Sequence, residues 1–361
     1  MALAQFSQSA YSSADSSGSS RLEMLVPSPQ SKLGSVSVVI VVWNAKAYVL
    51  ECLESLIQHC SGAYTEVIIV DNASTDGTPE LIERRFPEFT IIRNTENLGF
   101  AKANNIGIQH TTGEYVCLVN SDVKFTSDCF SPMLEYFAEH PEASMLGPQS
   151  LWPNGEVRRS TMRFPTVWNN FCRALGLHLL FKKSRLFGGL EMSEFNHLST
   201  RAVEVLVGWF VVARRSAINR VGLLDPQFFI YGEDVDWCYR FHQCGEKVVF
   251  FADAEAVHYG GASSSNAPLR FYLEKCYSEW QYWRKHYGRV SRLFFITFLI
   301  MHHSVRVLGC GWKYLRTPAS RSETRDKIRR SLVCLKWLFQ LHRRPLEMAV
   351  AFEGQDSSSV V

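Results

Sequence analysis

Blocks of apolar residues alternate with amphipathic stretches through the first third of the chain. Residues 46–60 and 101–110 place apolar side chains at helical intervals, and Thr78-Pro79 is typical of a helix start. Continuous β-branched runs are expected where a strand is buried on both faces of a sheet. The alternation therefore predicts an α/β domain with a Rossmann-like, mostly parallel central sheet flanked by helices. The predicted strands occupy residues 35–42, 66–70, 89–93 and 114–119.

The pattern is less regular in the second part of the domain. Residues 149–201 carry proline, glycine and several basic residues, which predicts loops and short helices. A helix is expected within residues 228–245, after an aromatic run. We therefore expect one folded domain over residues 35–288. Its remaining strands are predicted at residues 203–212 (interrupted at Gly208-Trp209), 247–252 and 256–259.

Both ends of the chain differ from this domain. Residues 1–34 are rich in serine, alanine and glutamine without periodicity, which predicts a disordered leader, and residues 351–361 are expected to be disordered as well. Residues 289–350 predict a basic, amphipathic helical tail. Its apolar run at 293–301 has nine residues, fewer than the roughly 20 that a membrane span needs. Helices that lie in the membrane interface fit this pattern, and packing on the folded domain or on a second subunit is the alternative.

The charge is distributed unevenly. The formal net charge of the 361 residues is +3, but residues 284–345 contain 15 Lys/Arg and two acidic residues, so the rest of the chain carries −10. A basic tail on an acidic body is expected to face an anionic partner, such as lipid headgroups, and no nucleic-acid partner is expected. None of the ten cysteines forms a CxxC pair, which argues against zinc ribbons and thioredoxin-type chemistry.

The expected compartment follows from the cysteines and from the start of the chain. Several cysteines lie in apolar runs, where they are expected to be small core residues. The first residues show no secretory-signal pattern. We therefore expect a protein of the reducing cytoplasm, held peripherally on the inner face of the plasma membrane if the tail binds lipid.

Polar residues collect where the predicted strands end. They are Trp43-Asn44, Asp71-Asn72, Asn94 to Asn97 and Ser121-Asp122. Ligands of open α/β sheets bind beyond the carboxyl ends of the strands. The carboxylate of Asp122 would suit a hard divalent cation, although Ser-Asp also caps turns. Asp71 needs a partner because it ends a buried strand, and a nucleobase N–H is one candidate.

A glycine- and asparagine-rich loop follows the third predicted strand. Gly99 would let the backbone approach a ligand closely, with Phe100 next to it, and the amides of Asn97 and Asn104 supply donors and acceptors. The alternative is a simple connection between strand and helix.

Acidic residues and a histidine mark the second half of the domain. Glu233 and Asp234 are expected at a helix start, where the helix dipole favours anions, or one of them acts as a general base. Asp236 and Arg240 are spaced as a supporting pair within one helix. His258 precedes a Gly/Ser loop that could wrap phosphate oxygens, and a neutral imidazole is a reasonable ligand for manganese-like ions.

Six segments, taken in this order, resemble the family 2 glycosyltransferases of the GT-A fold, in particular the bacterial rhamnosyltransferase-like branch. The resemblance covers about residues 36–287. The segments are Val41-Val42-Trp43-Asn44, Val70-Asp71-Asn72 with the following turn, Glu96-Asn97-Leu98-Gly99-Phe100-Ala101, Asn120-Ser121-Asp122-Val123, Tyr231-Gly232-Glu233-Asp234 and His258-Tyr259-Gly260-Gly261.

The resemblance implies an inverting glycosyltransferase. Its donor would be a dTDP- or UDP-linked sugar, with L-rhamnose as the leading choice among hexoses, and its acceptor a hydroxyl of a glycan or of a lipid-linked sugar. Residues 35–125 would bind the donor and residues 126–288 the acceptor. A non-catalytic nucleotide-sugar or lipid-carrier binding protein, derived from a transferase, is the alternative.

The family pattern also assigns roles to single residues. Asp234 would be the general base and Glu233 its positioning partner. Asn120 stands where the family's metal motif often has its first acid, so binding of Mn²⁺ or Mg²⁺ would rest on Asp122 with His258. The donor would contact Trp43, Asn44, Asp71, Asn72, Asn97, Gly99, Phe100, Asn104 and Ser121.

Overall fold

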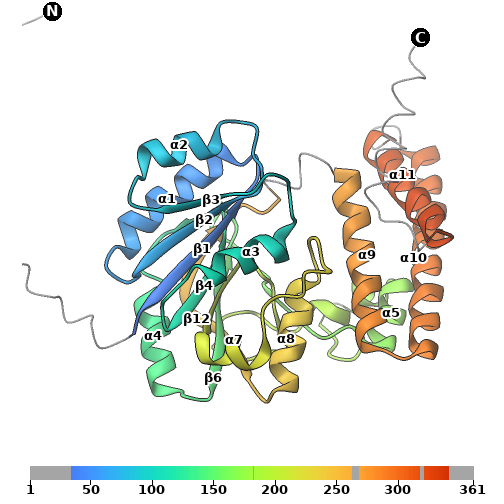
Figure 1. Cartoon of the computed structure of the whole chain (residues 1–361). Coiled ribbons are helices and arrows are strands. Elements are labelled where there is room, and N and C mark those ends of the chain that lie inside the picture. Colours follow the sequence, from blue (N-terminus) through green and yellow to red (C-terminus); the bar gives the residue numbers. More distant parts are fainter. Residues whose placement is uncertain (1–33, 182, 262–267, 318–320, 341–361) are drawn as a thin grey trace, which may run out of the picture.

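The structure, a computed structural model, describes residues 34–181, 183–261, 268–317 and 321–340. Its centre is a ten-stranded mixed sheet with the main strand order β3-β2-β1-β4-β11-β6-β12-β5. Strands β1, β2, β3, β4, β6 and β12 of this sheet are labelled in Figure 1. The first half alternates β1 (Val36–Val42), α1 (Lys46–Cys60), β2 (Glu66–Asp71), α2 (Thr78–Arg85), β3 (Thr90–Arg93), α3 (Phe100–Gln109), β4 (Tyr115–Asn120), β5 (Val123–Phe125) and α4 (Phe130–Glu139). The predicted α/β domain with a mostly parallel sheet is confirmed.

The second half adds shorter elements before the C-terminal helices. They are β6 (Ala143–Leu151), β7 (Val157–Arg158), β8 (Thr161–Met162), α5 (Val167–Ala174), α6 (Leu177–Leu180), the 3-10 helix η2 (Gly189–Glu191), β9 (Arg201–Ala202), β10 (Val205–Leu206), β11 (Phe210–Arg214), α7 (Arg215–Val221), α8 (Glu233–Gln243), β12 (Lys247–His258), α9 (Pro268–His286), α10 (Arg289–Arg316) and α11 (Arg321–Leu338). Short helices and loops were expected in this region, and they are present between residues 152 and 200.

Strand register places the polar strand ends at one edge of the sheet. Val42 pairs with Asp71 in the parallel β1–β2 ladder, and Val41 pairs with Asn120 in the parallel β1–β4 ladder. Because the three strands run in the same direction and end level, the residues that follow them emerge side by side. This register brings together polar segments that lie up to 80 residues apart in the sequence.

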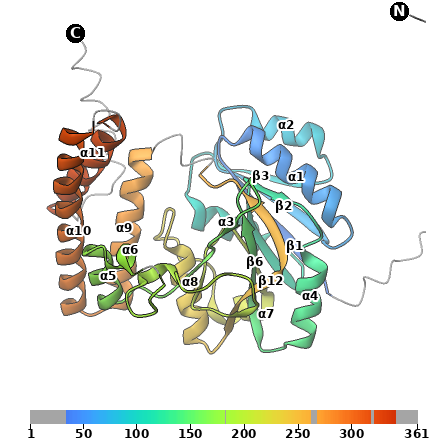
Figure 2. The same ribbon diagram turned by 180° about the vertical axis from the view of Figure 1, so that it is seen from behind.

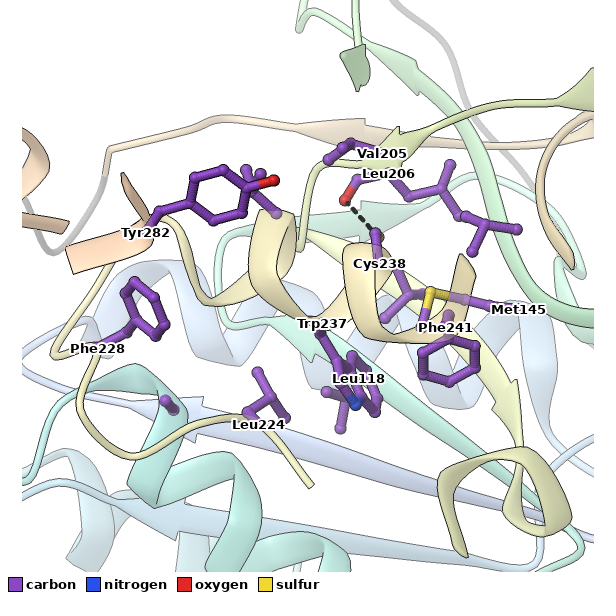
Figure 3. Packing of buried hydrophobic residues seen from close by; sticks show 14 of the residues in the cluster. Leu118, Met145, Val205, Leu206, Leu224, Phe228, Trp237, Cys238, Phe241 and Tyr282 are labelled. Atoms are coloured by element: carbon purple, nitrogen blue, oxygen red, sulfur yellow. Dashed lines mark hydrogen bonds between the residues drawn. The ribbon is translucent and has the colours of Figure 1, made fainter. Parts of the chain in front are cut away.

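Two hydrophobic clusters cover the two faces of the sheet. The side chains of Val36, Val38, Ile40 and Val42 belong to the cluster that packs α1, α2 and α4, whereas Val39 belongs to the other cluster. This separation follows from the two-residue period of a strand. The second cluster joins the sheet to α3, α7 and α8, and Figure 3 shows its part around α8. Its labelled residues are Leu118, Met145, Val205, Leu206, Leu224, Phe228, Trp237, Cys238, Phe241 and Tyr282.

Several strand predictions need correction. The segments expected as two strands, 247–252 and 256–259, form the single strand β12, with a register irregularity between Phe251 and Glu255. Strand β6 was not anticipated, because Gly147 and Pro148 interrupt its apolar pattern. Strand β11 runs antiparallel to both of its neighbours, so the sheet is mixed at this point.

The C-terminal helices gather beside the α/β domain, next to α5 and α6 (Figure 2). Phe295 and Leu299 of α10 and Val333 and Trp337 of α11 are buried in the same core as α8 and α9. Packing on the folded domain, the alternative to membrane contact, is therefore present on one face of the tail. We expected the apolar run at 293–301 to be too short for a membrane span. This expectation is wrong, because the run is part of the 28-residue helix α10, which is long and apolar enough to cross a membrane by length and composition.

Candidate active site

A cleft of about 470 Å³ opens at the carboxyl ends of the parallel strands. Its wall combines the ends of β1, β2 and β4, the loop before α3, the start of α8 and the end of β12. Most of the site residues predicted from the sequence lie in this wall. They are Trp43, Asn72, Asn97, Gly99, Phe100, Ser121, Asp122, Glu233, Asp234 and His258.

Asp122 and His258 form a buried pair in the cleft. The His258 Nε2 lies 3.3 Å from an Asp122 carboxylate oxygen, because β5 pairs His258 with Val123 in an antiparallel ladder. The imidazole ring stacks on Trp209, with ring centroids 5.1 Å apart. One carboxylate and one imidazole fit a divalent ion that takes its other ligands from phosphate oxygens and water. These two residues could therefore hold Mn²⁺ or Mg²⁺ against a bound diphosphate.

The start of α8 carries the two acidic residues of the cleft. Asp234 is half-buried and accepts hydrogen bonds from the backbone N–H of Gly208 (3.1 Å) and of Val235 (2.8 Å). Burial raises its pKa although these N–H groups lower it. Glu233 is buried, and its Oε2 has no hydrogen-bond partner within the part of the chain that the structure describes. Burial, and then the charge of Asp234, raise the pKa of Glu233 well above its usual value.

A second pocket of about 250 Å³ meets the cleft at Asp234. Its wall comes from the segment between β8 and η2 and from α9, and it combines apolar side chains with Arg173, Lys275 and Glu279. The guanidinium of Arg173 and the carboxylate of Glu279 form two hydrogen bonds, of 3.0 and 2.7 Å. Asp234 therefore lies between the cleft, which is lined by strand ends, and the second pocket, which is lined mainly by helices.

Three predicted site residues do not line the cleft. The Asp71 carboxylate accepts from the backbone N–H of Ser74 at 3.2 and 3.3 Å, which holds the turn after β2. Asn44 accepts from the backbone N–H of Thr75 at 2.8 Å. The Asn104 amide donates to the Phe100 carbonyl inside α3. Each of the three thus stabilises local structure next to the cleft, and their contact with the nucleotide sugar, including that of Asp71 with the nucleobase, stays a prediction.

The loop before α3 is held by Asn72 and Gly99. The Asn72 side chain donates to Asn97 Oδ1 (2.9 Å) and accepts from the backbone N–H of Leu98 (3.0 Å). Gly99 has a φ of +84°, and a Cβ there would lie 2.4 Å from the carbonyl oxygen of Phe229. The close approach expected at Gly99 is therefore made to the segment that precedes α8. This contact fixes the loop before α3 against the segment that leads into Glu233 and Asp234.

Arg158 and Gly208 are among the cleft residues that were not expected from the sequence. Arg158 lies in the cleft wall and donates to the carbonyl of His258 (2.7 Å), and its guanidinium packs over Trp152. The proline- and glycine-rich segment around Arg158 contains several basic residues, and no pattern in the sequence distinguishes Arg158 from the others as a cleft residue. Gly208 approaches Asp234 so closely that a Cβ would lie 3.2 Å from the Asp234 Cβ. Only the interruption of the strand at Gly208-Trp209 pointed to it.

Asp236 has a different role from its acidic neighbours. It is fully buried and contacts Arg240 (2.9 Å), Lys285 and His286 (both 2.7 Å). These partners lower its pKa against the effect of burial. The expected support of α8 by Asp236 and Arg240 is confirmed, and the pair also ties α8 to the end of α9.

The fold and the cleft define a GT-A protein. The mannosyltransferase PcManGT of Pyrobaculum calidifontis, solved in complex with GDP-Man and Mn²⁺, has the same fold with a TM-score of 0.51 at 16% sequence identity, over 85% of this chain and 88% of that one. The family model of glycosyl transferase family 2 matches residues 37–218. The chain therefore belongs to glycosyl transferase family 2 and is a glycosyltransferase.

Curated relatives support the same family. The N-acetylglucosaminyl-diphospho-decaprenol L-rhamnosyltransferase of Mycobacterium tuberculosis (strain CDC 1551 / Oshkosh) is 29% identical over 216 residues, which cover 56% of this chain and 69% of that protein. Glycosyltransferase GlyG of Streptococcus pneumoniae serotype 4 is 23% identical over 222 residues, 60% of this chain and 68% of GlyG. The resemblance to the rhamnosyltransferase-like branch is thus confirmed at modest identity.

Proposed function

We propose that this chain is an inverting transferase that moves a sugar, L-rhamnose or another hexose, from a dTDP- or UDP-linked donor to a hydroxyl of a lipid-linked glycan. The observation that carries the proposal is the position of Asp234 where the strand-end cleft meets the second pocket. A donor in the cleft and an acceptor in the pocket would meet at this carboxylate. The relative that transfers L-rhamnose to N-acetylglucosaminyl-diphospho-decaprenol motivates the choice of sugar and acceptor.

The donor diphosphate would lie between Arg158 and the Asp122–His258 pair. Arg158 brings a guanidinium that suits phosphate oxygens, and it is partly desolvated by the cleft wall. Asp122 and His258 would hold a divalent cation. Such an ion, when bound, offsets the charge that develops on the departing diphosphate. The turn around Asp71 is the proposed place for the nucleobase.

Asp234 would take the proton of the acceptor hydroxyl. In the transfer, a bond forms between the acceptor oxygen and the anomeric carbon while the bond from that carbon to the diphosphate oxygen breaks. The acceptor attacks from the side opposite the leaving group, which inverts the configuration. The raised pKa of Asp234 suits this role, because a general base works best when its pKa approaches the working pH. Glu233, behind it, would keep the carboxylate in place.

The exposed apolar residues on the outer face of α10 are an argument for a lipid-linked acceptor. Leu308 and Leu315 are 74% and 77% exposed, and with Val305 and Trp312 they form one apolar stripe at helical spacing. Lys313 lies next to the stripe. An apolar stripe with a cation beside it fits the surface of an anionic bilayer. We therefore propose a cytoplasmic enzyme held peripherally at the membrane, so that a lipid carrier reaches the second pocket from the bilayer.

The test of the proposed reaction begins with the purified full-length protein and a panel of nucleotide sugars. A donor that fits should raise the thermal midpoint, because a ligand that binds the folded state stabilises it. Transfer is then measured with that donor and a polyprenyl-diphosphate-linked N-acetylglucosamine, with and without Mn²⁺. Product of inverted configuration supports the proposal. The proposal is contradicted if the product has retained configuration, or if none of the dTDP- and UDP-sugars raises the thermal midpoint.

The membrane step needs its own test. Removing everything after Gly288 would also remove Phe295 and Trp337 from the core, so point substitutions are preferable. Leu308→Gln and Leu315→Gln together should reduce flotation with anionic liposomes, whereas Leu198→Gln, at an exposed leucine outside α10, should not. Equal flotation of all the proteins contradicts a role for the α10 stripe.

A further inference from the structure

Three buried side chains from three different helices converge in the C-terminal bundle. Cys276 of α9, His303 of α10 and Cys334 of α11 each offer a ligand atom, and these atoms all lie within 4.8 Å of one another. Both cysteines are free thiols. None of the three residues lines the cleft or the second pocket. The cluster is therefore separate from the candidate active site.

The imidazole of His303 is the unusual member of this cluster. The residue is 1% exposed, yet neither Nδ1 nor Nε2 has a hydrogen-bond partner within the described part of the chain. A buried polar group without a partner destabilises the folded state. The centroid of the His303 ring lies 5.1 Å from that of His302 and 6.1 Å from that of Tyr272. A metal ion bound to one imidazole nitrogen would give that nitrogen a partner.

We propose that Cys276, His303 and Cys334 bind one thiophilic divalent cation, and that this ion is Zn²⁺. Zinc binds thiolates at about 2.3 Å and imidazole nitrogen at about 2.0–2.1 Å, so tetrahedral ligand atoms are about 3.5–3.8 Å apart. Since all the ligand atoms lie within 4.8 Å of one another, each pair would have to approach by about 1.3 Å at most. A water or a further side chain would complete the coordination.

The charge balance favours zinc in this place. Binding replaces two thiol protons, which are released to solvent, so two thiolates, a neutral imidazole and Zn²⁺ form a site with no net charge. A neutral complex is tolerated in a dry core, whereas an isolated charge is not. A monovalent soft ion such as Cu⁺ would leave one negative charge uncompensated. The cysteines form no CxxC pair, so the ligands come together only through the packing of the three helices.

The site would link the tail to the acceptor side of the enzyme. Lys275 and Glu279, on either side of Cys276 in α9, line the second pocket. An ion that joins α9 to α10 and α11 would fix this pocket wall to the helices that carry the exposed apolar stripe. Cys276 and Cys334 are buried core residues, as expected for cysteines in apolar surroundings, and the proposal gives them a binding role as well.

The experiment uses full-length protein purified under reducing conditions without chelator. We expect about one tightly bound zinc per chain by elemental analysis. Replacement by Co²⁺ should give thiolate-to-cobalt charge transfer and the intense d–d bands of tetrahedral cobalt. Cys276→Ser and Cys334→Ser should lose both the zinc and the charge-transfer band. Cys310→Ser, at a partly exposed cysteine of α10 outside the cluster, is the matched control and should keep both.

Two further measurements distinguish zinc in this cluster from a cation in the cleft and from a loss of folding. Asp122→Asn should leave the cobalt–thiolate band unchanged, because the active-site cation has no sulfur ligand. Binding of a nucleotide diphosphate by the serine variants would show that the α/β domain is folded. Zinc-free protein that gives no cobalt–thiolate band, or a Cys276–Cys334 disulfide detected by mass spectrometry in the protein as isolated, would overturn the proposal.

Discussion

Replacing the Asp234 carboxylate with an amide tests the assignment of the general base. Asp234→Asn keeps the size of the side chain but removes its ability to take a proton. General-base catalysis contributes about 10²–10⁴-fold, so kcat should fall by this factor, which corresponds to about 3 to 5 kcal/mol of activation free energy. Binding of nucleotide diphosphate should change by no more than a few-fold, because the cleft wall around the phosphates is untouched.

The structure also bounds the effect of this substitution on stability. The carboxylate accepts from two backbone N–H groups, at Gly208 and Val235. An amide can accept only through its oxygen, so one N–H would face the NH₂ group, at a cost of about 1–3 kcal/mol. Removing a carboxylate whose pKa is raised by burial offsets part of this cost. The loss of kcat should therefore far exceed any loss of folded protein.

The assay measures kcat and KM for transfer, the Kd for the nucleotide diphosphate and the thermal midpoint on the same preparations. Glu233→Gln is the matched control, because it neutralises the adjacent acid of the same cleft. We expect it to keep a substantial part of kcat. Normal kcat in Asp234→Asn, or a loss of kcat confined to Glu233→Gln, would refute the assignment and exchange the two roles.

Three further predictions concern the same cleft. Glu233→Gln should raise the thermal midpoint near neutral pH. Because the pKa of Glu233 is raised in the folded state, the residue ionises on unfolding, and this ionisation destabilises the native protein more as pH rises. The difference in thermal midpoint between the two proteins should vanish near about pH 4, where the carboxyl is protonated in both states. Arg158→Gln should weaken binding of nucleotide diphosphate about tenfold or more in calorimetry, with little effect on binding of the nucleoside alone; equal losses for both would contradict a diphosphate contact. Chelation by EDTA should suppress turnover, and Mn²⁺ or Mg²⁺ should restore it; insensitivity would remove Asp122 from metal binding.

The first half of the fold could be predicted because its strands are short, β-branched and regularly separated. The helix at 46–60 and the strands that end at Asp71 and Asn120 were located to within a residue or two. The polar strand ends then indicated the position of the cleft, since parallel strands end at one edge. Asp122 and His258, 136 residues apart in the sequence, are brought together by the β5–β12 ladder. The family resemblance suggested this pair, whereas local pattern alone did not.

Other parts depend on tertiary contacts that leave little trace in local sequence. Strand β6 carries Gly147 and Pro148 and is stabilised by two neighbouring strands rather than by its own propensity. The roles of Arg158 and Gly208 arise from contacts with residues 100 and 26 positions away. Asp71, at the end of β2, holds a turn, and Asn104, inside α3, bonds within its own helix. Polar residues serve both for binding and for local structure, so the sequence alone does not reveal these local roles, and contact of either residue with the donor stays a prediction.

The most direct test of the central claim is a crystal structure of the full-length protein with a nucleotide diphosphate and Mn²⁺, recorded at the manganese absorption edge. We expect an anomalous peak between Asp122 and His258, the diphosphate beside Arg158, and Asp234 facing the position that the sugar would occupy. Nucleotide bound outside the strand-end cleft, or on the side of the molecule away from Asp234, would contradict the claim.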